Sequence, residues 1–230
     1  MPFMELESFE KLEELPIFPL GTVLFPGAIL PLHIFEDRYK QMMRFATDNG
    51  NLFGLSYRSD ALIGRETPPE AGSVGCLAKI QAVMPLEEGR MNVISTGLVR
   101  YRIIELHQLT PFVIARVEAF GDDLEADEDL DDLFESMLDR CKKFIAAAQA
   151  LDESVTAIDE DLPEDPEAFS LIISSALPID NEAKQSLLEM TSTRSRLTRL
   201  RQHVVAALAD YTQRIEIQTR AKHNGHGKLQ

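Results

Sequence analysis

The sequence contains 230 residues, of which 44% are hydrophobic and 27% are charged, a composition typical of globular proteins. This length allows one large domain or two small ones, each with a buried core. The net charge of -15 disfavours a general nucleic-acid binder, because an acidic protein and a phosphate backbone repel each other.

The N-terminal region shows no pattern typical of membrane insertion or export. Its longest uncharged apolar stretch, residues 15–35, contains four prolines, and a membrane-spanning helix does not accommodate prolines at that density. The first fifteen residues are acidic, whereas secretory signals and transit peptides are basic. We therefore expect a cytoplasmic protein with no membrane partner.

The first half of the chain alternates in the manner of half-buried antiparallel strands, and one helix interrupts it. The helix is predicted over Asp37 to Asp48, with Asp37 as its cap and Asn49-Gly50 as its end. Strands are predicted at Gly75 to Val83, Val99 to Ile103 and Val113 to Ala119, with a hairpin turn at Glu88-Gly89. In the first of these strands, one face is expected to carry Cys76, Ala78, Ile80 and Ala82.

After Gly121 the apolar residues recur with the period of amphipathic helices. A long helix is predicted from about Asp129, and a second runs from Pro166 to Leu177, with the proline in its first turn. A short helix is predicted at Asn181 to Met190. Thr191 or Thr193 is expected to cap a final helix that reaches about Arg220.

These patterns predict an α+β organisation with a β-rich subdomain at 1–121 and a helical subdomain at 122–230. Residues 122–193 carry 4 basic and 21 acidic side chains, a net charge of -17. Within them, 152–167 is predicted to be a solvated acidic connector, because it is charge-rich and interrupted by prolines. Residues 221–230 are predicted to be a frayed tail.

No arrangement of residues supports catalysis or cofactor binding. The only Gly-Lys pair, Gly227-Lys228, lies in the terminal tail and lacks the remainder of a phosphate-binding loop. Ser8 and Lys11 match a Ser-x-x-Lys motif by letters alone, without its partner motifs. We predict no catalytic residues, no cofactor and no enzyme activity. Neither ATP hydrolysis nor degradation of casein is expected.

Metal binding is likewise not predicted. His33, Glu36 and Asp37 hold three potential ligands, but their spacing is not that of a helical zinc motif. The alternative, a strand that leads into a capped helix, explains the same residues. The two cysteines, Cys76 and Cys141, are too few for a four-cysteine zinc site, and we expect no disulfide between them in a reducing compartment.

Several segments match one known family in order along the chain. They are LPIFPLGTVLFPGAILPLHIFEDRYKQMM at Leu15 to Met43, Phe53 to Leu55, Val74 to Ile80, Asn92 to Ile103 with Tyr101 in the aromatic place, Lys184 to Glu189, and Arg196 to Leu200. In this order they resemble the Lon protease N-terminal (substrate-binding) domain family. The resemblance covers roughly residues 13–213, and its long ordered match in the first half is the specific part.

The resemblance implies a PUA-like β pseudo-barrel with one inserted helix, followed by an all-helical bundle. It also implies binding of unfolded or damaged polypeptide on behalf of a protease. Full Lon proteins add an ATPase and a peptidase, and we expect a free-standing copy of the binding domain here. The implied function is a non-catalytic module that binds exposed apolar segments as an adaptor or chaperone-like factor.

An apolar partner-binding loop is predicted at Phe25, Pro26 and the nearby Ile29, because a proline-glycine turn limits how fully its neighbours can be buried. The alternative is that Phe25 and Ile29 belong to the core, as large apolar side chains generally do.

A second functional hypothesis is RNA binding, since PUA-like barrels elsewhere bind RNA. It would use a basic C-terminal helix, and nearby acidic stretches count against it. The basic residues in question are Arg194, Arg196, Arg199, Arg201, Arg214 and Arg220.

Overall fold

The structure is a computed structural model that describes residues 10–59, 67–123, 130–151 and 162–225. Among these residues, six strands form one mixed sheet and five α-helices accompany it, which confirms the predicted α+β class. The strands are β1 (Lys11–Leu20), β2 (Ile29–Ile34), β3 (Leu52–Tyr57), β4 (Val74–Pro85), β5 (Met91–Gln108) and β6 (Val113–Ala119).

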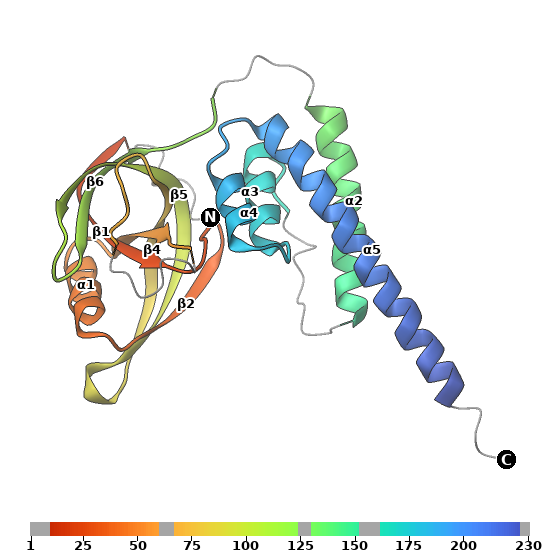
Figure 1. Ribbon diagram of the computed structural model, residues 1–230, viewed down its shortest axis with the longest axis horizontal. Coiled ribbons are helices and arrows are strands. Elements are labelled where there is room, and N and C mark those ends of the chain that lie inside the picture. The colour runs from red at the N-terminus through yellow and green to blue at the C-terminus, as the bar shows by residue number, and fades with distance from the viewer. Residues whose placement is uncertain (1–9, 60–66, 124–129, 152–161, 226–230) are drawn as a thin grey trace. The chain divides into compact units, whose positions relative to one another are not determined.

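The sheet closes on itself through its longest strand, β5 (Figure 1). The order is β2-β5-β4-β3-β1-β6, and an additional β5–β6 pairing joins the end of this series back to β5. The Met91–Thr96 part of β5 pairs with β2, and the part from Tyr101 onward pairs with β6. β1 and β3 pair in parallel. The result is a five-stranded closed barrel to which β2 adds an outer edge, in agreement with the predicted pseudo-barrel.

Strand β4 is buried on both of its faces along its first half. Cys76, Ala78 and Ile80 contribute to one apolar cluster, as predicted, while Leu77 contributes to the other. The predicted fourth member of that face, Ala82, is exposed instead. A register shift between Ile80 and Ala82 interrupts the alternation, because a bulge adds a residue to one strand and re-aims those that follow.

Helix α1 (Asp37–Asp48) covers one side of the sheet, and its bounds match the prediction. Met42, Met43 and Ala46 are buried in the cluster that also holds Phe18 and Phe53. The predicted cap at Asp37 is wrong: Glu36 occupies the N-cap position without a side-chain cap bond, and Asp37 lies in the first turn. There it pairs with Lys40, one turn along.

The chain divides into two compact units, and their composition differs from the predicted 1–121 and 122–230 division. The β-rich unit ends at Asp123 but also includes Asp180–Thr191, which carries α4 (Asn181–Leu188). Side chains explain why this helix joins the β-rich unit. Asn181 donates to the Gly21 carbonyl, and Gln185 donates to the Val74 carbonyl.

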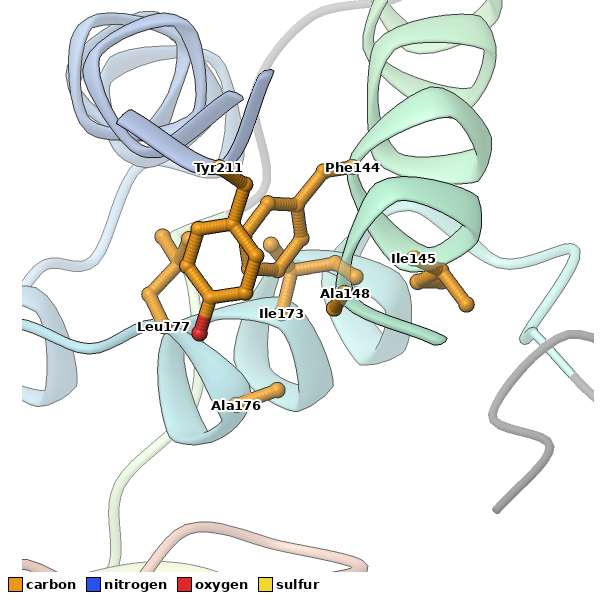
Figure 2. A pocket seen from close by; sticks show the side chains of 7 residues that line it. All are labelled: Phe144, Ile145, Ala148, Ile173, Ala176, Leu177 and Tyr211. Carbon is orange, nitrogen blue, oxygen red and sulfur yellow. The ribbon is translucent and has the colours of Figure 1, made fainter. Parts of the chain in front are cut away.

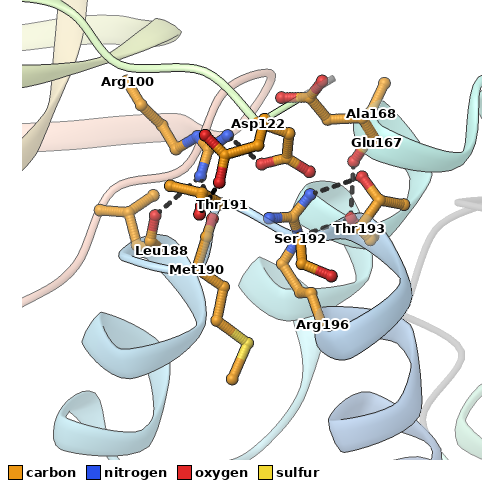
Figure 3. Close-up of polar contacts among 12 residues, drawn as sticks. Arg100, Asp122, Glu167, Ala168, Leu188, Met190, Thr191, Ser192, Thr193 and Arg196 are labelled. Carbon is orange, nitrogen blue, oxygen red and sulfur yellow. Dashed lines mark hydrogen bonds and ion pairs between the residues drawn. The ribbon is translucent and has the colours of Figure 1, made fainter. Parts of the chain in front are cut away.

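The buried Arg100 makes the main connection between β5 and the end of α4 (Figure 3). Its guanidinium donates to the carbonyls of Leu188 and Met190 and to the carboxylate of Asp122. The sequence pattern places Arg100 on the polar side of a strand, so its burial was not predicted. Carbonyls at a helix end have no partner within the helix, and the guanidinium supplies donors to this region.

The helical unit contains α2 (Asp131–Leu151), α3 (Pro166–Ala176) and α5 (Thr193–Gly225), with α2 and α5 side by side (Figure 1). Asp165 caps α3 by accepting a hydrogen bond from Ala168. At the start of α5, the Ser195 amide donates a capping hydrogen bond to the Ser192 hydroxyl. The cap is therefore Ser192 and not the predicted Thr191 or Thr193. The final helix also extends to Gly225, beyond the predicted Arg220.

Candidate functional site

The outward face of β2, β5 and β4 carries the most exposed apolar side chains of the β-rich unit's sheet. Cross-strand neighbours share a face, and the register places Pro31 opposite Ile94 and His33 opposite Asn92. Beyond them, Ala82 and Met84 of β4 lie opposite the same two β5 residues. We call this surface the three-strand face, and its residues are Ile29, Pro31, His33, Phe35, Ala82, Met84, Asn92, Ile94 and Thr96.

Three large apolar residues of the three-strand face are open to solvent. Ile29 is 71% exposed, Phe35 59% and Met84 45%. Phe35 follows the end of β2 and stacks on His33, with ring centroids 6.0 Å apart. Isolated exposed apolar residues are common on proteins, whereas a group of them on one face is the pattern typical of interaction surfaces.

A polar pair lies within this apolar surface. The Nδ1 atom of His33 is 2.7 Å from the Oδ1 atom of Asn92. Because an amide oxygen only accepts, this hydrogen bond requires the imidazole proton to be on Nδ1. The pair joins β2 to β5 across the face and leaves the apolar residues on either side of it.

The hairpin that ends β4 is held in place by α1. Lys40 donates to the Glu88 carbonyl at the turn and to the Asp37 carboxylate, each at 3.1 Å. Within the turn, the Leu86 amide donates to the Arg90 carbonyl at 2.8 Å. These bonds link the turn that follows Met84 to α1.

Strand β2 lies at an edge of the sheet. It pairs with β5 on one side and, in the part of the chain that the structure describes, with no strand on the other. An edge of this kind presents unpaired backbone groups that another chain can use. Pro31 interrupts the edge because it has no N–H group to donate.

The three residues of the predicted binding loop, Phe25, Pro26 and Ile29, differ in their exposure to solvent. Phe25 is fully buried, so its proposal as an exposed anchor is wrong and its assignment to the core is right. Pro26 is half-buried, whereas Ile29 is exposed and belongs to the three-strand face. The turn explains the difference: Gly27 adopts a positive φ of 80°, and Ala28 donates to the Phe25 carbonyl, which turns Phe25 into the interior.

The histidine and carboxylates of the sequence motif at residues 33–37 have separate partners. His33 bonds to Asn92, Glu36 pairs with Arg38 at 2.8 Å, and Asp37 pairs with Lys40. Within the described ranges, no group of three or more His, Cys, Asp or Glu residues has an arrangement that would hold a metal ion.

Both cysteines have free thiols and are buried. Burial raises the pKa of the Cys141 thiol from 9.0 to about 12, and it raises that of Cys76 further. The reactive form of cysteine is the thiolate, so neither side chain is prepared for nucleophilic chemistry in the folded protein.

The C-terminal arginines do not form one continuous basic surface. Arg196 is fully buried and donates to the Ser170 and Thr193 hydroxyls. Arg214 pairs with Asp210 one turn away. The side chain of Arg220 lies outside the described residues. The predicted RNA-binding surface therefore lacks at least one of its members. None of the helices in the described segments is long and apolar enough to cross a membrane.

Sequence reasoning missed Phe35 and Met84. Phe35 alternates in step with Pro31 and His33, and a period of two would have placed its side chain on the same outward face. Met84 lies just beyond the predicted strand end at Val83. The bulge near Ile80 brings it outward, and no pattern in the sequence indicates that bulge.

Comparison with known proteins gives a consistent result. Residues 14–206 match the family model described as the ATP-dependent protease La (LON) substrate-binding domain. The Lon protease of Bacillus thuringiensis (strain Al Hakam) is 26% identical over 183 residues, which cover 79% of this chain and 23% of that protein. Lon protease 1 of Bacillus subtilis (strain 168) is 24% identical over 192 residues, covering 83% and 25%. The chain thus spans about a quarter of the length of these relatives.

Two solved structures share the fold. The N-terminal domain of a Mycobacterium avium complex Lon protease superposes with a TM-score of 0.63 at 19% identity, covering 84% of this chain and 98% of that one. A Lon N-terminal domain protein from Xanthomonas campestris gives a TM-score of 0.59 at 21% identity, covering 82% and 97%.

Proposed function

This chain belongs to the ATP-dependent protease La (Lon) substrate-binding domain family, and we propose on that basis that it binds unfolded or exposed apolar segments of other proteins without catalysing a reaction. Its family makes it a substrate-binding module. The choice of unfolded segments as ligands, and a role as an adaptor for a protease or a chaperone-like factor, are our proposals.

The observation that carries the proposal is the three-strand face. Ile29, Phe35 and Met84 expose large apolar surface on a rigid sheet. Their burial against an apolar segment contributes about 25 cal/mol for each Å² removed from water. A folded protein keeps most such segments inside, so the surface distinguishes non-native chains from native ones.

The edge of β2 favours an extended polypeptide over a helix as the ligand. A strand that adds to a sheet edge uses main-chain hydrogen bonds, which are available whatever the sequence, while alternate side chains occupy the adjacent face. Pro31 removes one of the donors on this strand. We therefore expect apolar side-chain contacts to supply most of the affinity and the edge to supply orientation.

The test is a double variant, Ile29→Thr with Met84→Thr, which removes apolar surface from β2 and β4 and keeps residues that strands accept. The ligand is a fluorescently labelled lysozyme that is permanently unfolded by reduction and carbamidomethylation. Binding is followed by fluorescence anisotropy in 0.15 M salt. We expect the Kd to rise tenfold or more, which corresponds to about 1.4 kcal/mol, with an unchanged melting temperature.

The matched control is Leu109→Thr. Leu109 is 54% exposed but lies after β5, away from the three-strand face in the sequence register. Like each of the two substitutions in the double variant, Leu109→Thr replaces one exposed apolar side chain with threonine, so general stickiness of the protein would weaken binding in the control as well. Equal losses, or no loss in the double variant, would show that the three-strand face does not bind the unfolded chain.

A further inference from the structure

A second apolar site lies in the helical unit, where α2, α3 and α5 meet. Figure 2 shows side chains from the three helices around one cavity, whose volume is about 140 Å³. The lining residues are Phe144, Ile145, Ala148, Ile173, Ala176, Leu177 and Tyr211. None of these belongs to the β-rich unit, so the site is independent of the three-strand face.

We propose that this cavity binds a single aromatic ring that carries one hydrogen-bonding group, as in a phenol or an indole. The size is the first reason. An apolar cavity of about 150 Å³ in another protein stays free of water and binds benzene. The cavity here is similar in volume and is lined by aliphatic and aromatic side chains, so water gains few hydrogen bonds inside it.

The composition of the walls is the second reason. Ile145, Ala148, Ile173 and Leu177 are buried and form an aliphatic base. Phe144 and Tyr211 are only partly buried and meet edge to face, with ring centroids 5.3 Å apart and planes at 72°. A third ring can add to such a pair in the same offset or edge-to-face geometry, which contributes beyond the burial of its area.

The hydroxyl of Tyr211 gives the cavity its selectivity. It is the only polar side-chain group among the seven lining residues, and in Figure 2 it lies next to Ala176 and Leu177. A phenolic hydroxyl both donates and accepts, so it can bond to the hydroxyl of a phenol or the N–H of an indole. A purely apolar ring of the same size would gain the contacts and lack this bond.

The neighbouring small residues keep the cavity open. Alanine at 148 and 176 leaves space that a larger side chain would occupy, and Ala176 is exposed at the rim. Unfilled apolar space lowers stability, because its lining loses packing contacts. The protein with an empty cavity is therefore expected to be less stable than the protein with the cavity filled, either by a ligand or by a larger side chain.

The first experiment measures binding of p-cresol, indole and toluene to the full chain by isothermal titration and by thermal shift. We expect saturable binding of one p-cresol per chain with a Kd on the order of 1 mM or tighter, a rise in melting temperature, and weaker binding of toluene. Tyr211→Phe should lower the p-cresol affinity to that of toluene and leave toluene binding unchanged. Absence of saturable p-cresol binding would overturn the proposal.

Filling the cavity provides a second, independent variant. Ala148→Leu should abolish ring binding and raise the melting temperature, since leucine occupies the space from a buried position. The control is Ala146→Leu, on the exposed side of the same helix, which should retain ring binding. If Ala148→Leu binds p-cresol as tightly as the wild type, the ring does not occupy this cavity.

The source of the ring is decided by competition. Unfolded lysozyme contains aromatic side chains, and displacement of p-cresol by it would identify the ligand as part of a polypeptide. Retention of p-cresol alongside bound lysozyme would show that the polypeptide does not occupy the cavity, which leaves it open to a free small molecule. Both outcomes support the ring site, and neither depends on the three-strand face, because Ile29→Thr/Met84→Thr leaves the cavity intact.

Discussion

Removal of Arg100 tests whether one buried guanidinium holds α4 on the barrel. Arg100 is 2% exposed, and the side chain of its carboxylate partner Asp122 is 8% exposed. Arg100 also donates to the carbonyls of Leu188 and Met190, at 3.0 and 2.6 Å. Close by, the Asp123 amide and carboxylate bond to Thr191, so several bonds converge at this end of α4.

The expected cost follows from these partners. In Arg100→Met the methionine keeps most of the side-chain length but supplies no donor. Breaking a buried ion pair from one side typically costs 3–5 kcal/mol, because the other charge stays buried without compensation. Two carbonyls at the helix end also lose a charged donor, which adds roughly 1 kcal/mol or more each where they remain buried. We expect the free energy of unfolding of the β-rich unit to fall by at least about 3 kcal/mol.

Arg102→Met is the matched control, two residues along the same strand. Both guanidinium groups lie over the Phe120 ring, at 5.1 Å for Arg100 and 4.5 Å for Arg102. Arg102 is exposed, however, and its partner Glu118 is 3.8 Å away, so its loss should cost less than about 1 kcal/mol. Urea unfolding gives both energies, and hydrogen exchange of residues 180–191 locates the effect. Similar costs for the two variants, or unchanged exchange in α4, would refute the reasoning.

Two further predictions concern packing and pH. Gly97→Ala places a Cβ against the backbone carbonyl oxygen of Phe25. Because the backbone cannot move aside easily, we expect the free energy of unfolding in urea to fall by about 1–3 kcal/mol. The control Gly121→Ala has open space around its Cβ and should change stability by less than about 0.5 kcal/mol, so equal effects of the two substitutions would contradict the assigned contact. For Cys141, the folded pKa of about 12 exceeds the ordinary 9.0, so the unfolded chain releases its thiol proton first. Stability contributed by this group is complete below pH 9 and falls by about 1.4 kcal/mol per pH unit as the pH rises toward 12. Cys141→Ala should show a shallower decline between pH 9 and 11, and an unchanged slope would show that the thiol is not buried as described.

Local patterns predicted much of the secondary structure. The helix at Asp37–Asp48, the start of α3 at Pro166 and the strand at Val113–Ala119 match the structure. Each of these segments has a regular apolar period. In such segments local preference and burial agree, so the sequence alone contains the information.

Contacts between distant segments were not predictable in the same way. Arg100 alternates with apolar neighbours as an exposed residue would, and only its partners 88 and 90 residues later explain why it is buried. Phe25 is similar, because its burial depends on the close approach of its carbonyl to Gly97 of β5. One sequence without aligned relatives does not show which distant residues meet.

The end of β4 supports the proposal that the three-strand face binds a partner. Cys76, Ala78 and Ile80 are apolar because the core requires it. Beyond the register shift the requirement ends, since residues 81–86 are all exposed, yet Ala82 and Met84 on the three-strand face remain apolar. Polar residues at these positions could form the same backbone hydrogen bonds with β5, and exposed apolar strands promote aggregation. If the core does not require these apolar side chains, polar substitutions on the three-strand face should leave the stability of the fold unchanged. A loss of binding in such variants can then be attributed to the surface and not to unfolding.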